Sequence, residues 1–354
     1  MTNKDSFLTK DDTTYLKAIA ILFIVFHNFL HLLPPVYFNN EFTFRLGYVF
    51  IAIGNFSLEE SINVFFSFFG YIGIYVFFFL SGYGLTKKQI VCEDKWYSIK
   101  RIWKLEKLLI IGILVYILTK LGDVNYSHVL SKLTLTDNFS LAKVRRISAS
   151  WWFLACTAQL YLIYFPLYKY IRKSSWNILF VLYFYTILSY FWIFSPYREE
   201  YMYRNCLGHI PEFSLGIFLA CYEDKLAFLK RKSWVVFLIS IVVLLMAQFS
   251  MWIWIFNGLA TVGVFIGAYL IFGKIIQNKF IKYIGTISSY IYITHCILFR
   301  QFFVVVARYA SPLEKIIWCL VWLLIVFTIC TIIYILNQKQ KSIKSLKNKQ
   351  THSN

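Results

Sequence analysis

Apolar residues recur along the chain in long runs that end at charged or turn residues. A helix needs about 20 mostly apolar residues to cross the hydrocarbon core of a bilayer, and most of the runs approach this length. The pattern therefore predicts an all-α, polytopic membrane helix bundle with about ten transmembrane helices. The ten runs are Tyr15–Leu33, Phe65–Leu85, Leu105–Leu121, Trp151–Tyr168, Trp176–Phe194, His209–Cys221, Trp234–Met251, Trp252–Phe272, Tyr283–Val304 and Ile316–Leu336.

Parts of this pattern are irregular. The sixth run is short and starts beside Pro211, while the seventh and eighth are nearly continuous and require a tight reversal near Met251. A further apolar piece, Tyr48–Phe56, is too short to span a bilayer. We expect this piece to be re-entrant or interfacial.

The composition supports a membrane protein, because 59% of the residues are hydrophobic and only 15% are charged, against roughly 25% in a soluble domain. No polar stretch is long enough to fold by itself. We therefore expect a cytoplasmic segment at residues 1–14, one transmembrane domain at 15–336 and a basic cytoplasmic tail at 337–354. The seven cysteines are scattered, without a CxxC pair or metal-ligand spacing to a histidine, so no metal is expected.

The net charge of +19 has two possible explanations. In a soluble protein it would suggest a nucleic-acid partner, but cytoplasmic loops of membrane proteins also collect Lys and Arg. With the N-terminus inside, 25 of the 36 Lys and Arg fall in inner segments, which predicts that both termini are cytoplasmic. The tail is expected to contact anionic membrane lipid, and nucleic-acid binding is not expected.

Ionisable side chains inside a membrane cost about 2.5–3.5 kcal/mol on insertion scales, so each one is a functional candidate. In the first run, His27 and His31 lie four residues apart on one helix face, with Asn28 beside them. A neutral imidazole there can serve as a general base towards an alcohol. Packing between helices is the alternative for both histidines.

Two more polar groups lie near the outer ends of runs. In the sixth run Glu212 follows Pro211, where it can cap the helix, pair with Arg204 or bind a substrate hydroxyl. In the ninth run Arg300 can extend its side chain to the interface, so only His295 needs a partner inside the bundle. Function and packing both remain open for His295.

Seven basic residues lie between Lys87 and Lys107, in a segment predicted to be cytoplasmic. Topology alone accounts for such a loop. The alternative is a phosphate site for an anionic cofactor, with Arg101 and Lys104 among the ligands. No P-loop, GxGxxG, HExxH or GxSxG motif is present, which argues against nucleotide hydrolysis, zinc proteolysis and serine-hydrolase chemistry.

In their order and spacing, five segments resemble the acyltransferase-3 family of membrane acyltransferases, which O-acylate cell-surface glycans. The resemblance runs from Tyr15 to about Phe302. The family's characteristic element in the first helix is a basic residue, then ten residues, then a His. This sequence departs from it, since Lys17 replaces Arg and only nine residues separate Lys17 from His27. The segments are LKAIAILFIVFHN in the first run, GIYVFFFLSGYGL (73–85), WWFLACTAQLYLIYFPL (151–167), GHIPEFSLGIFLA (208–220) and YIGTISSYIYITHCILFR (283–300).

The resemblance implies transfer of an acyl group from cytosolic acyl-CoA, most often acetyl-CoA, to a hydroxyl of a cell-surface or lipid-linked glycan, at the bacterial inner membrane. It implies His27 as the base, with Glu212 and Asn28 as orienting groups. The other implied roles are CoA binding by Lys17, Arg101 and Lys104, and substrate binding by His31, Trp151, Trp152, Arg204, His209 and His295. An aromatic belt would also account for the two tryptophans. The alternative function is a transporter or flippase for a lipid-linked sugar.

Overall fold

The structure is a computed structural model that describes residues 6–120, 124–193 and 198–351. Within these residues it is all-helical, as predicted. Four short 3-10 segments are η1 (Gly70–Ile72), η2 (Asp137–Phe139), η3 (Ala149–Trp151) and η4 (Cys206–His209). The α-helices are α1 (Lys10–Leu30), α2 (Leu46–Gly54), α3 (Ser61–Phe69), α4 (Gly73–Cys92), α5 (Tyr97–Lys120), α6 (Tyr126–Leu133), α7 (Leu141–Val144), α8 (Trp152–Lys173), α9 (Asn177–Ile193), α10 (Arg198–Tyr203), α11 (Ile210–Cys221), α12 (Glu223–Leu226), α13 (Phe228–Arg231), α14 (Ser233–Phe249), α15 (Met251–Trp254), α16 (Asn257–Ile276), α17 (Lys279–Thr294), α18 (Arg300–Ala307) and α19 (Pro312–Thr351).

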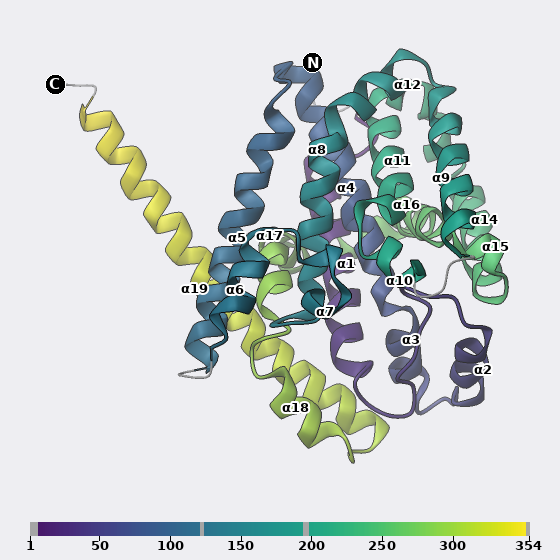
Figure 1. The fold of residues 1–354 in the computed structure, drawn as a ribbon, viewed down its shortest axis with the longest axis vertical. Coiled ribbons are helices and arrows are strands. Elements are labelled where there is room, and N and C mark those ends of the chain that lie inside the picture. Colours follow the sequence, from purple (N-terminus) through teal and green to yellow (C-terminus); the bar gives the residue numbers. More distant parts are fainter. Residues whose placement is uncertain (1–5, 121–123, 194–197, 352–354) are drawn as a thin grey trace.

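Helix α1 is the central element of the bundle (Figure 1). It begins with a capping box, in which the Thr9 hydroxyl accepts from the Asp12 backbone N–H and the Asp12 carboxylate accepts from that of Thr9. At its other end it packs very closely on the η1–α4 segment. A Cβ added at Gly70 would lie 2.6 Å from the His27 Cβ, and one at Gly73 would lie 2.4 Å from the Ala20 carbonyl oxygen. These two glycines therefore fix where His27 lies.

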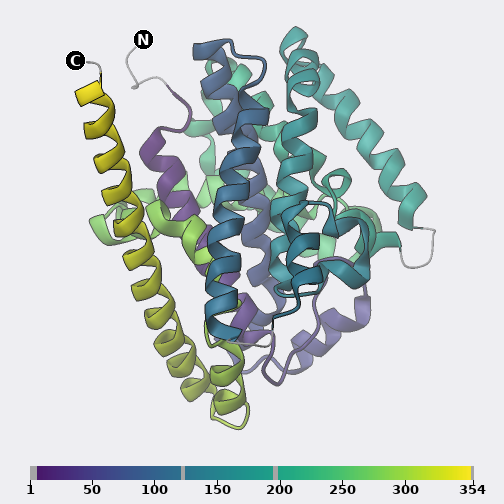
Figure 2. The ribbon, with the colours of Figure 1, turned by 60° about the vertical axis from the view of Figure 1, so that its left-hand side comes forward.

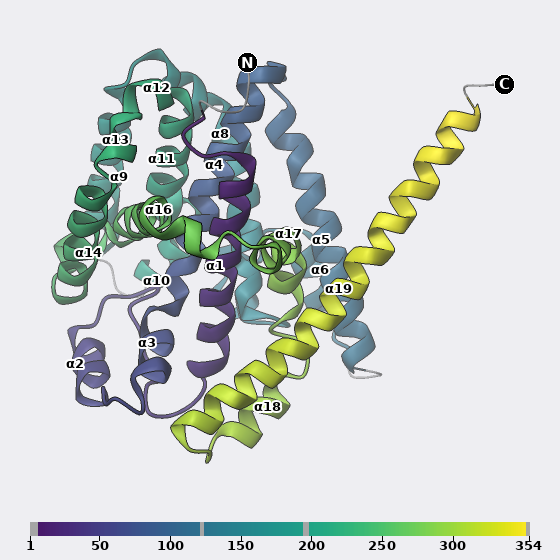
Figure 3. The same cartoon turned by 180° about the vertical axis from the view of Figure 1, so that it is seen from behind.

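Helices α4 and α11 are held together in the same way. A Cβ at Gly82 would lie 2.1 Å from the Phe213 carbonyl oxygen, and one at Gly216 would lie 2.2 Å from that of Phe79. Because each helix places a glycine against the backbone of the other, their axes approach closely. In Figures 1 and 3, α16 and α17 are seen nearly end-on, so they run across α1 rather than along it.

Large apolar side chains are exposed over much of the molecule, which is expensive in water and normal in lipid. On α9 they include Phe180, Tyr183 and Phe184, each more than 60% exposed. Among the described residues, four helical segments are long and apolar enough to cross a membrane, namely Lys10–Leu30, Ser61–Cys92, Asn257–Ile276 and Pro312–Ser342. The chain is therefore a membrane protein.

The ten crossings predicted from the sequence are not confirmed, because fewer helices in the described part of the chain are long and apolar enough to span a membrane. Beyond the four long segments, Glu223–Arg231 (α12 and α13) and α14 would form a fifth span only if they are taken together, and the two parts are bent by 86°. The runs predicted at Trp176–Phe194 and His209–Cys221 form helices too short for the length criterion. The piece predicted at Tyr48–Phe56 corresponds to α2, which lies beside α3 at the His27 end of α1.

The first and the last helix of the described chain reach the same end of the molecule. The start of α1 and the far end of α19 are at the same end of the bundle (Figure 2). The termini predicted at 1–14 and 337–354 are described only from residue 6 and up to residue 351, and the remainder lies outside the described residues. The ends of the runs predicted to reach Leu121 and Phe194 also lie outside them.

Candidate active site

A cavity of about 300 Å³ lies at the C-terminal end of α1. Its wall combines α1, the segment that follows it, η1, α4, the start of α8 and the turns around α10 and α17. Residues distant in sequence thus meet around one space. The charged and polar side chains in the wall are His27, Asn28, His31, Asn39, Glu41, Tyr71, Ser150, Arg204, Tyr292 and Arg300.

The protonation pattern of the His27 ring follows from its contacts. The Nδ1 atom lies 3.0 Å from the Phe66 carbonyl oxygen. Because a carbonyl can only accept, Nδ1 carries the ring proton and Nε2 keeps its lone pair. The Nε2 atom lies 3.4 Å from the Asn39 amide nitrogen and 3.9 Å from Glu41 Oε2. The ring is therefore held in the form that can accept a proton from a molecule in the cavity.

The residues beside His27 on α1 differ in what they offer. The His31 ring stacks on that of His27 with 4.9 Å between centroids, and its Nδ1 lies 3.5 Å from the Asn39 amide nitrogen. The Asn28 amide donates to the Ile24 carbonyl oxygen of its own helix at 2.9 Å. All three predicted residues of this helix reach the cavity.

Glu41 is a cavity carboxylate that sequence reasoning missed. Its side chain is 19% exposed and faces His27. Burial raises the pKa of Glu41 to about 7; the positive charge of Arg204 opposes this shift and the negative charge of Glu200 adds to it. The residue follows the cis Pro34–Pro35 bond in a segment without helical periodicity. No spacing pattern in the sequence could have placed it beside His27.

Arg204, predicted from the sequence as a binding residue, lines the cavity. Its guanidinium pairs with the Glu200 carboxylate at 2.9 Å and stacks over the Phe42 ring at 3.8 Å from the ring centroid. The Nη1 atom is buried and has no hydrogen-bond partner in the described part of the chain. A buried donor without a partner is costly, and a ligand in the cavity could satisfy it.

The two tryptophans at the start of α8 have different positions. Trp152 lines the cavity. Trp151 does not, because it is fully buried and its indole N–H donates to the Ile293 carbonyl oxygen at 3.0 Å. Only Trp152 is therefore positioned to stack on a sugar face.

The predicted residues His209 and Glu212 lie behind the Trp152 side of the cavity, not in its wall. The His209 ring stacks on Trp152 with 5.4 Å between centroids, and its Nε2 lies 2.9 Å from the Tyr203 carbonyl oxygen. Its Nδ1 lies 3.8 Å from Glu212 Oε2. Both side chains are almost fully buried, and a Cβ at Gly258 would clash with the Glu212 carboxylate. With this geometry, His209 and Glu212 support the cavity wall from behind.

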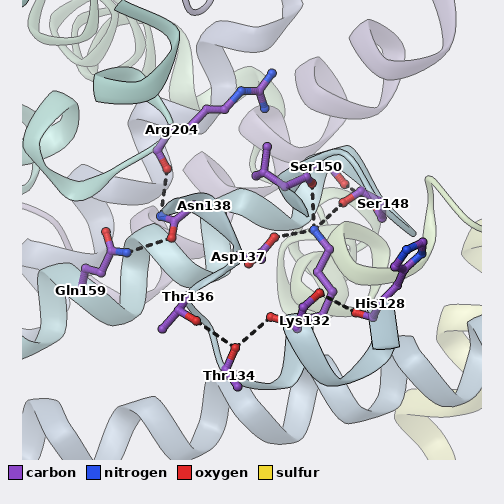
Figure 4. A network of polar contacts seen from close by, with 12 residues as sticks. His128, Lys132, Thr134, Thr136, Asp137, Asn138, Ser148, Ser150, Gln159 and Arg204 are labelled. Atoms are coloured by element: carbon purple, nitrogen blue, oxygen red, sulfur yellow. Dashed lines mark hydrogen bonds and ion pairs between the residues drawn. The ribbon is translucent and has the colours of Figure 1, made fainter. Parts of the chain in front are cut away.

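A network beyond the cavity fixes the segment that leads into α8 (Figure 4). The buried Lys132 ammonium donates to the Asp137 carboxylate at 2.6 Å and to the Val144 carbonyl oxygen at 2.8 Å. It also reaches the Ser148 carbonyl oxygen at 3.4 Å, two residues before cavity residue Ser150.

The same network reaches Arg204. The Asn138 amide donates to the Arg204 carbonyl oxygen at 3.0 Å, and the Gln159 amide donates to the Asn138 side-chain oxygen at 2.9 Å. Two parts of the cavity wall are therefore joined through buried polar contacts. The sequence prediction had no signal for them, because Lys132 and Asp137 lie outside the apolar runs.

The predicted cofactor residues only partly come together. Lys17 and Arg101 line a second, smaller cavity of about 150 Å³, with Tyr97 and Tyr161. Lys104 is exposed and does not line it. Lys17 lies ten residues before His27 on α1, which is about 15 Å along the helix. The two cavities thus lie at different levels of one helix.

His295, the last predicted residue, is fully buried and outside the cavity wall, whereas Arg300 of the same sequence region lines it.

A family model described as "Acyltransferase domain", that of the acyltransferase-3 family, matches residues 12–337. No curated protein and no solved structure matches the chain. The matched range includes the cavity and every predicted site residue.

Proposed function

Because the chain belongs to the acyltransferase-3 family, we propose that it is a membrane-embedded O-acyltransferase. It transfers an acyl group from cytosolic acyl-CoA, with acetyl-CoA as the first candidate, to a hydroxyl of a cell-surface or lipid-linked glycan. The bacterial inner membrane is the proposed location. The observation that carries the proposal is the His27 ring, whose Nε2 lone pair faces a polar cavity while Nδ1–H is held by a carbonyl oxygen.

The residues around His27 suit acyl transfer to an alcohol. The acceptor hydroxyl gives its proton to His27 Nε2 while its oxygen attacks the carbonyl carbon of the acyl thioester, and the departing thiolate sulfur takes that proton. Glu41, 3.9 Å away, stabilises the imidazolium between these two events when it is ionised. The free Nη1 of Arg204 supplies a donor for the oxygen that becomes negative, or for the sugar.

The Lys17 cavity is our candidate for the CoA end of the donor. The basic side chains of Lys17 and Arg101 suit phosphate groups, and exposed Lys104 on the same helix as Arg101 can add a third. A donor held there extends along α1 for about 15 Å to reach His27. In this arrangement the start of α1 and both termini face the cytoplasm, in agreement with the distribution of Lys and Arg.

The test uses purified protein in lipid nanodiscs, labelled acetyl-CoA and a glycan acceptor. Label should move to the acceptor with the wild type and with His128→Ala, whose histidine lies on α6 outside the cavity. It should not move with His27→Ala. Movement of a lipid-linked sugar across vesicles without acyl transfer would replace the enzyme by the transporter or flippase.

A further inference from the structure

A second reactive group lies where α17 gives way to α18. Helix α17 ends at Thr294, and a turn follows in which Phe299 adopts a left-handed backbone conformation (φ 55°) before α18 begins at Arg300. This turn brings three side chains together. The Cys296 sulfur lies 3.1 Å from His295 Nε2 and 3.1 Å from Arg300 Nη1.

The contacts of His295 make it a base towards Cys296. Its Nδ1 lies 2.8 Å from the Tyr292 carbonyl oxygen and 3.1 Å from that of Ile291. Since both partners can only accept, Nδ1 holds the proton and Nε2 must accept from the thiol. The Arg300 guanidinium, at the same distance on another side, stabilises the sulfur once it is negative. The nucleophile Cys296 is thus in contact with its base, His295, and with Arg300, which stabilises the thiolate.

This thiol borders open space. Cys296 and Arg300 line a cavity of about 360 Å³ together with Tyr116 and Thr119 of α5. Arg300 also lines the His27 cavity, so one side chain is shared by the two walls. Among the described residues, no other cysteine contacts both a histidine nitrogen and an arginine nitrogen.

We propose that Cys296 is a catalytic nucleophile that carries the acyl group as a thioester between donor and acceptor. The proposal rests on the proposed function, because acyl-CoA is the donor. The Cys296 proton moves to His295 Nε2, and the thiolate attacks the carbonyl carbon of acyl-CoA. A new carbon–sulfur bond to Cys296 forms, the bond to the CoA sulfur breaks, and CoA leaves with the proton from His295.

The second half of the reaction uses the first cavity. The acceptor hydroxyl attacks the acyl-Cys296 carbonyl carbon and its proton passes to His27. The ester forms as the bond to the Cys296 sulfur breaks, and the proton taken by His27 returns to that sulfur through solvent. Atoms and charge balance in both halves, and no oxidant or metal is required.

The experiment incubates the full-length protein with labelled acetyl-CoA in the absence of acceptor, followed by an acid quench and peptide mass spectrometry. One acyl group should be found on the Cys296 peptide, and neutral hydroxylamine should remove it, as expected for a thioester. His27→Ala should still acquire this group and should fail to release it when acceptor is added. Cys92, which is exposed, reports non-specific acylation and should stay unlabelled.

Two variants complete the design. Cys296→Ser should lose the hydroxylamine-sensitive group and at least ten-fold of the transfer activity, whereas Cys206→Ser should keep both. If the wild type transfers label to the acceptor and no acyl group is found on Cys296, transfer is direct. The nucleophile role of Cys296 is then overturned, while the proposed function stands. If neither acceptor nor protein is labelled, both proposals fail. Equal labelling of Cys92 and Cys296 also overturns the nucleophile, and this readout does not depend on any variant folding.

Discussion

Replacement of Glu41 by Gln tests the geometry of the cavity most directly. The substitution keeps the size of the side chain and removes its charge 3.9 Å from His27 Nε2. In our mechanism this charge matters only while His27 holds the acceptor's proton. The variant should therefore lower turnover without raising the apparent KM for the acyl donor.

The magnitude follows from the distance. Two unit charges 3.9 Å apart interact by about 4 kcal/mol at an effective dielectric constant of 20, which sets an upper limit of about 10³-fold. Glu41 is partly exposed and Arg204 already neutralises some of its charge, so we expect a loss of about 10- to 100-fold.

The pH profile provides a second readout. Burial raises the pKa of Glu41 to about 7, against the opposing charge of Arg204 and with that of Glu200. Besides Arg204, the other ionisable groups around the same cavity are His27, His31, Tyr71, Tyr292 and Arg300. Wild-type turnover should fall as the pH drops through about 7, because protonation removes the charge that stabilises the imidazolium. Glu41→Gln should lack this step.

The contribution of Glu41 to the free energy of unfolding changes with pH in the opposite direction to turnover. A carboxyl group whose pKa is raised on folding favours the protonated form of the folded protein. Its contribution is complete below the unfolded value of about 4.5 and is lost as the pH rises towards 7. The midpoint of thermal unfolding should therefore depend less on pH in Glu41→Gln than in the wild type.

The assay is initial rate of transfer from labelled acetyl-CoA between pH 5.5 and 8.5, with protein in nanodiscs. Glu59→Gln, at an exposed position between α2 and α3, is the control. Wild-type turnover and an unchanged pH profile in Glu41→Gln would refute the assigned role of this carboxylate.

Three further predictions follow from the site. His27→Ala should reduce turnover by at least about 10²-fold with normal protein levels, and His31→Ala should have a milder effect; a larger loss in His31→Ala would move the base to that residue. Joint replacement of Arg101 and Lys104 by Ala should raise the apparent KM for acyl-CoA more than it lowers turnover, and an unchanged KM would leave the basic loop a topological feature. Lys132→Ala strands the buried Asp137 charge and should destabilise the protein by about 3–5 kcal/mol, measured by thermal unfolding in detergent; an unchanged midpoint would contradict a stabilising ion pair.

The sequence predicted the parts of the site that lie in apolar surroundings. His27 and His31 stand out in a run where a polar residue is expensive, and the structure brings them with Arg204 to one cavity. Glu41 could not be found in this way, because a carboxylate in a polar segment between helices is the ordinary case. Its position depends on how residues 31–45 fold back over α1, which no local pattern encodes.

Other predictions failed or stayed open for similar physical reasons. The all-helical class follows directly from the apolar runs, whereas the number of crossings depends on helix directions that run length does not determine. α16 is apolar enough to span and yet runs across α1. Trp151 was predicted at an aromatic rim, but its N–H is used by a backbone carbonyl of α17. The roles in CoA and sugar binding stay predictions.

The C-terminal helix places a constraint on the bilayer itself. Its apolar run, Ile316–Leu336, has 21 residues, or about 31 Å at 1.5 Å per residue, which is close to the thickness of the hydrocarbon core of about 30 Å. Helix α19 leans away from the bundle in Figures 1 and 3. Only 22% of its most apolar window is buried inside the protein, so lipid rather than protein surrounds most of it. A bilayer core thinner than this run would tilt α19 further, which couples the angle of this helix, and of α18 packed on it, to the thickness of the membrane.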